Sequence, residues 1–292
     1  MKFALAALAA VFNYVQADMP SEQVAKEKGL NLDESVQSDD MMLTPKQNKC
    51  FFTPDSNCTS TARTGFDKSV TSWTQYYNAR SRKYAIPLKV RTETYKARDL
   101  PKLWNSLNWA KNHLAQHTNI DIQFIDDAER DFYFNSGFLA PFNGGDCASY
   151  VGDISHIYRR SGWWEKGQMM NFGWCLDRAG SIVHEIMHAL GFVHEHSRHD
   201  RDQYLDVPYN FKPGTSAYVN CHPYSKEGLD TSGLPYDFGS IMHYPQSGCY
   251  GMRPKRKFGR VHIGQRNALS KQDIMGINDI YAASGPKYAR DV

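Results

Sequence analysis

The sequence predicts an α+β fold, and three features of the chain support this prediction. Between residues 84 and 124, a short apolar run is followed by apolar residues that recur every three or four positions and then by a stretch that alternates apolar and polar residues, which indicates a strand, a helix and a strand. A second helical segment at residues 180–190 stops at a glycine. From residue 194 to residue 268 the chain is rich in Pro, Gly, Tyr and Asp and has little periodicity, which is typical of irregular structure.

The first half of the chain contains most of the predicted regular structure. Residues 84–90 form a strand that starts at a sheet edge, because Pro87 has no N–H to donate to a neighbouring strand. Pro101 lies in the first turn of the long amphipathic helix that follows, where proline is tolerated. Strands are also predicted at residues 120–124 and 132–134. The apolar face of the helix consists of Leu100, Leu103, Leu107, Ala110 and Leu114.

The later elements follow a glycine-rich turn at residues 143–146. A strand at residues 169–172 leads to the second helix, and Gly191 comes directly after that helix, in the position of a left-handed cap. The last helix covers residues 269–281, with Ser270 as its N-cap.

The N-terminal part of the chain has a different composition. Lys2, an apolar run at residues 3–12 and a small residue at Ala17 predict a secretory signal peptide, residues 1–17. Residues 18–79 are polar and lack apolar periodicity, which predicts a pro-segment or a loosely ordered N-terminal extension. No later stretch approaches the roughly eighteen apolar residues that a membrane helix requires. We therefore expect a secreted, extracellular protein with no membrane anchor.

Charge and cysteine content limit the possible partners. The formal charge of +3 is too small to indicate a nucleic-acid partner, and we interpret the basic run at residues 253–257 as a solvated loop. An even number of cysteines in an exported chain indicates disulfide bonds, although the sequence alone leaves their pairing open. Proximity along the chain favours Cys50–Cys58, Cys147–Cys175 and Cys221–Cys249.

The central motif is His184-Glu185-Ile186-Met187-His188, within the second helix. Histidines four residues apart project from one helix face and can bind one ion, and neutral imidazole suits Zn²⁺. A catalytic zinc site needs a third protein ligand, which His194 supplies if Gly191 allows a sharp turn. The sequence thus predicts one Zn²⁺ per chain, held by His184, His188 and His194. The alternative for the first two histidines alone is an ordinary core or surface pair.

Longer segments resemble a known family. The pattern His184-Glu-x-x-His-x-x-Gly-x-x-His194 resembles the metzincin motif, and its continuation through Asp202 resembles the astacin family in particular. Residues 240–244, Ser-Ile-Met-His-Tyr, resemble the Met-turn of that family, and residues 146–152 and 269–281 also resemble astacin segments.

The resemblance covers about residues 80–284, which we expect to be the catalytic domain, with residues 285–292 as a C-terminal tail. It implies a zincin-like metalloprotease of two subdomains: a twisted mixed sheet with two long helices above a cleft, and mostly irregular chain below. It also implies a zinc-dependent endopeptidase that hydrolyses proteins or peptides. We expect a monomer.

The resemblance assigns further roles around the metal. Glu185 is the expected general base, and Tyr244 is the expected additional, displaceable metal ligand and stabiliser of the oxyanion. Met242 underlies the zinc. Glu195 resembles the glutamate that receives the N-terminal ammonium of the mature protein. Basic residues just past the Met-turn favour substrates with an acidic residue after the scissile bond.

Latency and function each leave an alternative open. The family inhibits itself with an aspartate in a Phe-x-Gly-Asp context, but no such match precedes Arg80, so Asp67 is the candidate inhibitory residue. A second functional hypothesis is a secreted binding or matrix module that keeps a structural zinc. Loss of Glu185 or of a metal ligand would indicate that module, and the sequence retains all of them.

Overall fold

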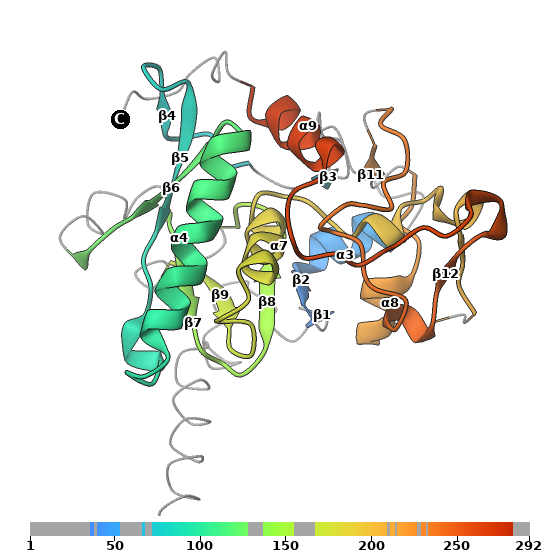
Figure 1. The fold of residues 1–292 in the computed structure, drawn as a ribbon, viewed down its shortest axis with the longest axis horizontal. Coiled ribbons are helices and arrows are strands. Elements are labelled where there is room, and N and C mark those ends of the chain that lie inside the picture. The colour runs from blue at the N-terminus through green and yellow to red at the C-terminus, as the bar shows by residue number, and fades with distance from the viewer. Residues whose placement is uncertain are drawn as a thin grey trace, which may run out of the picture.

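A computed structural model describes residues 36–37, 40–52, 66–67, 72–127, 137–154, 167–208, 211–213, 215–226, 229–231 and 233–282. The predicted signal peptide, the strand at residues 132–134 and the C-terminal tail lie outside the described residues. Figure 1 shows a half built on a sheet and two helices, which we call the sheet subdomain, and a half with short elements, which we call the irregular subdomain.

The described residues of the sheet subdomain include a mixed sheet of eight strands. Its order is β1 (Val36–Gln37), β2 (Met41–Leu43), β8 (Cys147–Tyr150), β9 (Gln168–Phe172), β7 (Leu139–Phe142), β5 (Lys83–Leu88) and β4 (Tyr77–Asn78), and β6 (Ile120–Phe124) pairs with β5. The pairs β5–β6, β5–β7 and β7–β9 are parallel, whereas β8 runs antiparallel to β9. At one end of the path, β2 adds to β8 in parallel.

Two helices cover one face of this sheet and lie side by side (Figure 1). Helix α4 (Leu100–His117) buries the predicted apolar positions from Leu103 to Leu114, because their spacing places them on one face. Helix α7 (Ala179–Ala189) is buried along almost its whole length, so it forms the centre of the molecule. A continuous apolar core joins the helices to strands β5, β6 and β9. This burial holds α7 in a fixed position.

The irregular subdomain contains helices α8 (Ser216–Cys221) and α9 (Lys271–Ile280) and two small ladders, β10 (Leu205–Asp206) with β12 (Arg253–Pro254) and β11 (Leu229–Asp230) with β3 (Phe66–Asp67). Short 3-10 helices occupy Thr92–Thr94, Glu195–Ser197, Arg201–Gln203, Gly248–Tyr250 and Arg256–Phe258. Ser270 caps α9 as predicted. The predicted α+β zincin-like fold is confirmed.

Disulfide bonds join Cys147 to Cys175 and Cys221 to Cys249, which confirms two of the predicted pairs. Cys50 is also disulfide-bonded, and its predicted partner, Cys58, lies outside the described residues. Within the part of the chain that the structure describes, no helix has the length and apolar character needed to cross a membrane.

Residues 40–52 form ordered structure, in contrast to the loose extension that was one of the two predictions for this region. After β2, helix α3 (Pro45–Phe52) packs through Phe51 on Tyr224, with ring centroids 4.8 Å apart. Met41 and Leu43 are fully buried in the same apolar cluster, beside Val193. The segment therefore contacts the sheet subdomain through β2 and the irregular subdomain through α3.

Candidate metal centre and active-site cleft

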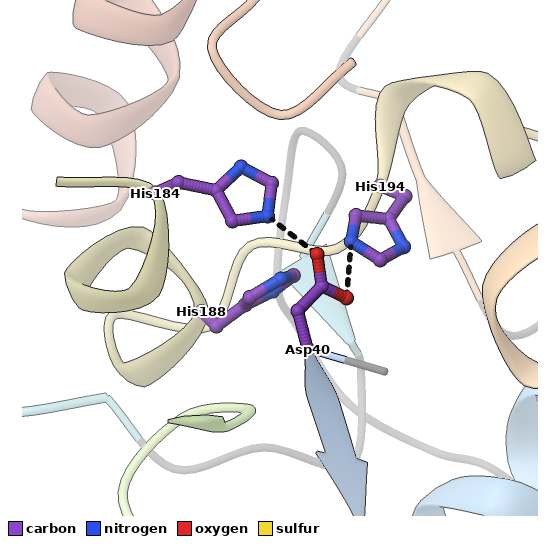
Figure 2. A group of neighbouring side chains, drawn as sticks. All are labelled: Asp40, His184, His188 and His194. Atoms are coloured by element: carbon purple, nitrogen blue, oxygen red, sulfur yellow. Dashed lines mark ion pairs between the residues drawn. The ribbon is translucent and has the colours of Figure 1, made fainter. Parts of the chain in front are cut away.

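The three predicted ligand histidines lie together and are almost completely buried. His184 and His188 are one turn apart on α7, with ring centroids separated by 4.7 Å. The ring of His194 lies 5.5 Å from that of His184 and 4.8 Å from that of His188. Figure 2 shows the three rings converging on one point. The spacing in the sequence is therefore realised as one cluster.

Gly191 makes this convergence possible. Its φ of 106° lies in the left-handed region, which glycine adopts without a Cβ penalty. The turn is closed by hydrogen bonds from the N–H of Gly191 to the carbonyl of His188 (2.8 Å) and from the N–H of Phe192 to the carbonyl of Met187 (3.0 Å). The chain reverses there and brings His194 back beside α7, as predicted.

Backbone carbonyls set which imidazole nitrogen of each helical ligand is available. Nδ1 of His184 lies 2.8 Å from the carbonyl oxygen of Ile241, and Nδ1 of His188 lies 2.8 Å from that of Phe192. A carbonyl can only accept, so Nδ1 carries the proton and Nε2 keeps its lone pair. Burial lowers the pKa of His184 to about 4 and that of His188 well below its ordinary value. Both rings are therefore neutral near pH 7.

This donor set fits the predicted zinc. The Nε2 atoms of His184, His188 and His194 are buried and make no hydrogen bond, although the carboxylate of Asp40 lies within ion-pair distance of those of His184 and His194. A buried polar atom without a partner is costly unless it binds something else. Three imidazole nitrogens are the ligand set that many catalytic Zn²⁺ sites use.

Asp40 is a fourth member of the cluster, and the sequence analysis did not identify it. Its Oδ2 lies 3.3 Å from Nε2 of His184, and its Oδ1 lies 3.2 Å from Nε2 of His194 (Figure 2). Burial alone would raise the pKa of the carboxyl, but the neighbouring His194 and His184 hold it well below its ordinary value. Asp40 is therefore an ionised carboxylate directed at the ligand nitrogens.

The expected inhibitory role of Asp67 stays a prediction. Asp67 pairs with Leu229 in the small ladder between β3 and β11, whereas Asp40 lies at the imidazoles. The signal that could have identified Asp40 is its place directly before the apolar triplet of β2, because a short buried strand fixes the residue that precedes it. A Phe-x-Gly-Asp pattern by itself does not predict this placement.

Glu185 is 2% exposed and follows the first ligand on α7. Its Oε1 lies 3.5 Å from Sγ of Cys147. This contact is not a hydrogen bond, because the sulfur is in a disulfide and carries no proton. Its Oε2 has no hydrogen-bond partner. Burial and the negative charge of Asp40 raise its pKa well above the ordinary value. A carboxylate in this state accepts a proton readily.

Asp273 links residues 240–244, which resemble the Met-turn, to the histidine cluster and to α9. The sequence did not predict this role. Asp273 accepts hydrogen bonds from Oγ of Ser240 (2.7 Å) and from the N–H of Ile241 (2.9 Å). The carbonyl of Ile241 in turn holds His184. Met242 is buried in the apolar core, as expected for a packing residue. The N-terminus of α9 therefore positions His184, a predicted ligand, through the hydrogen bond from the Ile241 N–H to Asp273 and the one from His184 to the Ile241 carbonyl.

Tyr244 lies beside the cluster. Its ring centroid is 4.5 Å from that of His194 and 4.4 Å from that of His196, and its hydroxyl donates to Oδ1 of Asn220 at 3.4 Å. The ring therefore lies beside His194, a predicted ligand, while the hydroxyl contacts Asn220. Its role as a metal ligand stays a prediction.

Glu195 contacts groups other than a chain terminus. Its Oε1 accepts from the N–H of Asp237 at 2.7 Å and from Nη1 of Arg198 at 3.2 Å. Burial raises its pKa to about 8 despite these contacts. The predicted contact with an N-terminal ammonium stays a prediction.

A cavity of about 740 Å³ adjoins the cluster, and Asp40 and Tyr244 are part of its wall. Its cationic residues are Arg178 and Arg266. The basic run at residues 253–257 does not line it, which corrects the expectation that this run faces the substrate. Gly180 brings the backbone of Arg266 close to α7, since a Cβ at residue 180 would lie 1.6 Å from the carbonyl oxygen of Arg266.

Comparisons with known proteins agree with this geometry. Residues 94–282 match the family described as Astacin, a family of peptidases. Zinc metalloproteinase nas-39 of Caenorhabditis elegans is 39% identical over 142 residues, which cover 46% of this chain and 14% of that protein. High choriolytic enzyme 1 of Oryzias latipes is 35% identical over 165 residues, which cover 50% of this chain and 58% of that protein.

The solved structure of the same Oryzias latipes protein, described as a hatching enzyme zinc-protease, superposes with a TM-score of 0.55 at 25% identity. The superposition covers 74% of this chain and 98% of that one. The chain spans less than two thirds of the length of the curated relatives it matches. The family match covers more than half of the chain and includes every residue of the three-histidine cluster, so the chain belongs to the astacin family of peptidases.

Proposed function

We propose that this protein is a secreted zinc-dependent endopeptidase that is synthesised in a latent form. One observation carries the proposal: three buried imidazoles whose Nε2 atoms have no hydrogen bond lie together with a buried glutamate of raised pKa, beside a cleft whose wall includes Asp40 and Tyr244. The disulfide bonds support an extracellular location, because such bonds persist in oxidising compartments.

His184, His188 and His194 would hold the ion. Zinc, when bound, would supply a Lewis acid that acidifies a water molecule and polarises the peptide carbonyl. Glu185 accepts the proton that the attacking water loses and delivers it to the nitrogen of the leaving amine, so the carboxylate is regenerated in each cycle. Its raised pKa suits both transfers, because a very weak base could not hold the proton between them.

The substrate would lie along the edge of β8 as an added strand. In the structure β2 occupies this edge: the N–H of Ser149 donates to the carbonyl of Asp40 (2.9 Å), and the N–H of Val151 donates to that of Met42 (3.3 Å). Arg178 and Arg266 in the cleft favour acidic side chains on the substrate. Strand β2 would therefore exclude substrate from this edge, while the carboxylate of Asp40, directly before β2, meets the proposed metal ligands.

The experiment that tests the proposed function is hydrolysis of casein by the activated protein, with and without a zinc chelator. We expect cleavage that the chelator abolishes and that added Zn²⁺ restores. A protein that contains zinc but leaves casein intact after removal of the segment containing Asp40 would indicate the binding module instead.

Latency can be tested at Asp40. In the uncleaved chain we expect Asp40→Ala to increase hydrolysis of a small quenched-fluorescent peptide about tenfold or more, since removal of one charged contact worth about 1.4 kcal/mol changes an equilibrium tenfold. The effect is partial because β2 still covers β8. Asp67→Ala is the matched control and should leave the activity of the uncleaved chain unchanged. Equal activity of both variants would contradict the role of Asp40.

Tyr244 is proposed to stabilise the negative oxygen that develops in the transition state. Tyr244→Phe keeps the ring on His194 and removes only the hydroxyl, so zinc content and folding should be preserved. We expect kcat and kcat/KM to fall together by about 10² to 10³, with little change in KM, as for the loss of one oxyanion donor. Steady-state kinetics with zinc analysis measure this. An unaltered kcat in a zinc-loaded variant would refute the role.

A further inference from the structure

A dense group of cations lies in the irregular subdomain, outside the site described above. Within residues 253–260, which we call the basic loop, Arg253, Arg256, Lys257 and Arg260 are exposed. No ion pair links any of these four side chains to another described residue. The fifth cation, Lys255, pairs with Asp206 at 3.7 Å. The chain as a whole has a formal charge of only +3, so this positive charge is a local feature.

The basic loop has a defined conformation. Arg253 and Pro254 form β12 and pair with β10, and the N–H of Lys255 donates to the carbonyl of Tyr204 at 2.8 Å. A 3-10 turn, Arg256–Phe258, follows and is closed by Gly259, whose φ of 72° is left-handed. A preorganised loop loses little conformational entropy when it binds a ligand.

Phe258 packs the loop against neighbouring aromatic rings of the irregular subdomain. Its ring stacks on Tyr204 with centroids 5.5 Å apart and meets Phe238 at 5.2 Å. The ring is partly buried between these aromatic neighbours and Lys257, whose Nζ lies 4.9 Å from its centroid, while Lys257 and Arg260 themselves are exposed. The loop therefore presents mainly charge, and its aromatic ring already has neighbours.

The basic loop is distant from the cleft. Figure 1 places β12 at the outer end of the irregular subdomain, well separated from α7, and none of its residues lines the cavity beside the metal cluster. A ligand on the basic loop would leave the cleft accessible. Its residues have no place in the mechanism proposed above.

We propose that the basic loop is a binding site for a sulfated polysaccharide. Exposed cations without carboxylate partners concentrate a positive potential that a flexible polyanion can neutralise, with affinity that decreases as salt is added. Three successive cations, Lys255 to Lys257, are followed after two residues by Arg260, so the charge is concentrated in a short stretch that one segment of a linear polymer can span. The disulfide bonds indicate an oxidising compartment, where sulfated polysaccharides are the abundant linear polyanions.

A single-stranded nucleic acid is the competing polyanion, and the structure favours it less. Proteins bind such strands by stacking bases on aromatic side chains as well as by charge. Phe258, the aromatic residue of the loop, is packed on other rings. Tyr250 is exposed and lines the groove next to Arg253, but it already stacks on Phe211. Asp202 and Asp206 also line this groove, so the cationic surface is confined to the loop itself.

The test compares the whole chain with a variant that carries Arg253→Ala, Arg256→Ala, Lys257→Ala and Arg260→Ala. Binding to heparin is measured by isothermal titration over a series of NaCl concentrations. We expect the dissociation constant near physiological salt to rise at least about tenfold, and the slope of log K against log salt to fall by about 3, roughly 0.7 to 0.9 per lost contact. Circular dichroism verifies that the variant is folded.

A second variant, Arg80→Ala, Lys96→Ala, Arg98→Ala and Lys102→Ala, removes the same charge from exposed positions of the sheet subdomain. It should bind heparin nearly as well as the original chain. Equal losses in the two variants would overturn the proposal, because net charge alone would then explain binding. Heparin with its sulfates removed should bind at least tenfold more weakly, and equal or tighter binding of single-stranded DNA than of heparin would also overturn it.

Discussion

Replacement of Glu185 by glutamine is expected to reduce kcat/KM of the activated enzyme by at least about 10³, or roughly 4 kcal/mol of barrier. The side chain keeps its size and its buried place on α7 but can no longer accept a proton. The three imidazoles are unchanged, so the variant should bind zinc as the original protein does. The measurement is hydrolysis of a quenched-fluorescent peptide, with zinc content determined on the same preparation.

The matched control is Glu195→Gln, which makes the same change in a second glutamate of raised pKa whose side chain is 15% exposed. Glu195 contacts Arg198 and Asp237 and is not directed at the cleft, so we expect a much smaller loss of activity. Comparable losses of activity in the two variants would show that removing the charge of any glutamate in this region reduces activity, and that the loss is not specific to Glu185. Equal turnover by Glu185→Gln and the original enzyme would refute the assignment of the base.

Replacement of His194 by alanine is expected to remove zinc as well as activity. Two imidazoles on one helix remain, and a site with two protein ligands binds Zn²⁺ far more weakly than one with three. After dialysis the zinc content should fall well below one ion per chain. In the latent chain Asp40 can replace the missing ligand, because its Oδ1 lies 3.2 Å from the nitrogen that would be removed. The measurement therefore uses the double variant Asp40→Ala, His194→Ala.

His117→Ala serves as the control, because His117 is exposed at the C-terminal end of α4 and does not belong to the histidine cluster. It should retain full zinc content in the Asp40→Ala background. If the double variant also retained full occupancy after dialysis, His194 would not be a ligand, and the three-imidazole site proposed here would be wrong.

The structure also shows which part of the N-terminal region lies at the histidine cluster. From the sequence, residues 18–79 had no periodic pattern that suggested a packed segment. In the structure, Asp40 reaches the ligands because β2 pairs with β8 on one side and α3 packs on Tyr224 on the other. Each of these elements is too short to be stable in isolation, so local propensity could not reveal them. Their order depends on contacts with residues more than a hundred positions away.

What the sequence by itself determined are the features that depend on near neighbours. Helical spacing places His184, Glu185 and His188 on one turn, Gly191 permits the reversal that returns His194, and Ser270 starts α9. Only the tertiary structure decided which distant groups complete the site. Asp40 contacts His184, Asp273 contacts Ile241, and Asn220 contacts Tyr244. Each pair is separated by many residues in the sequence. Such contacts depend on the packing of whole elements, whereas periodicity and capping report only on residues within a few positions.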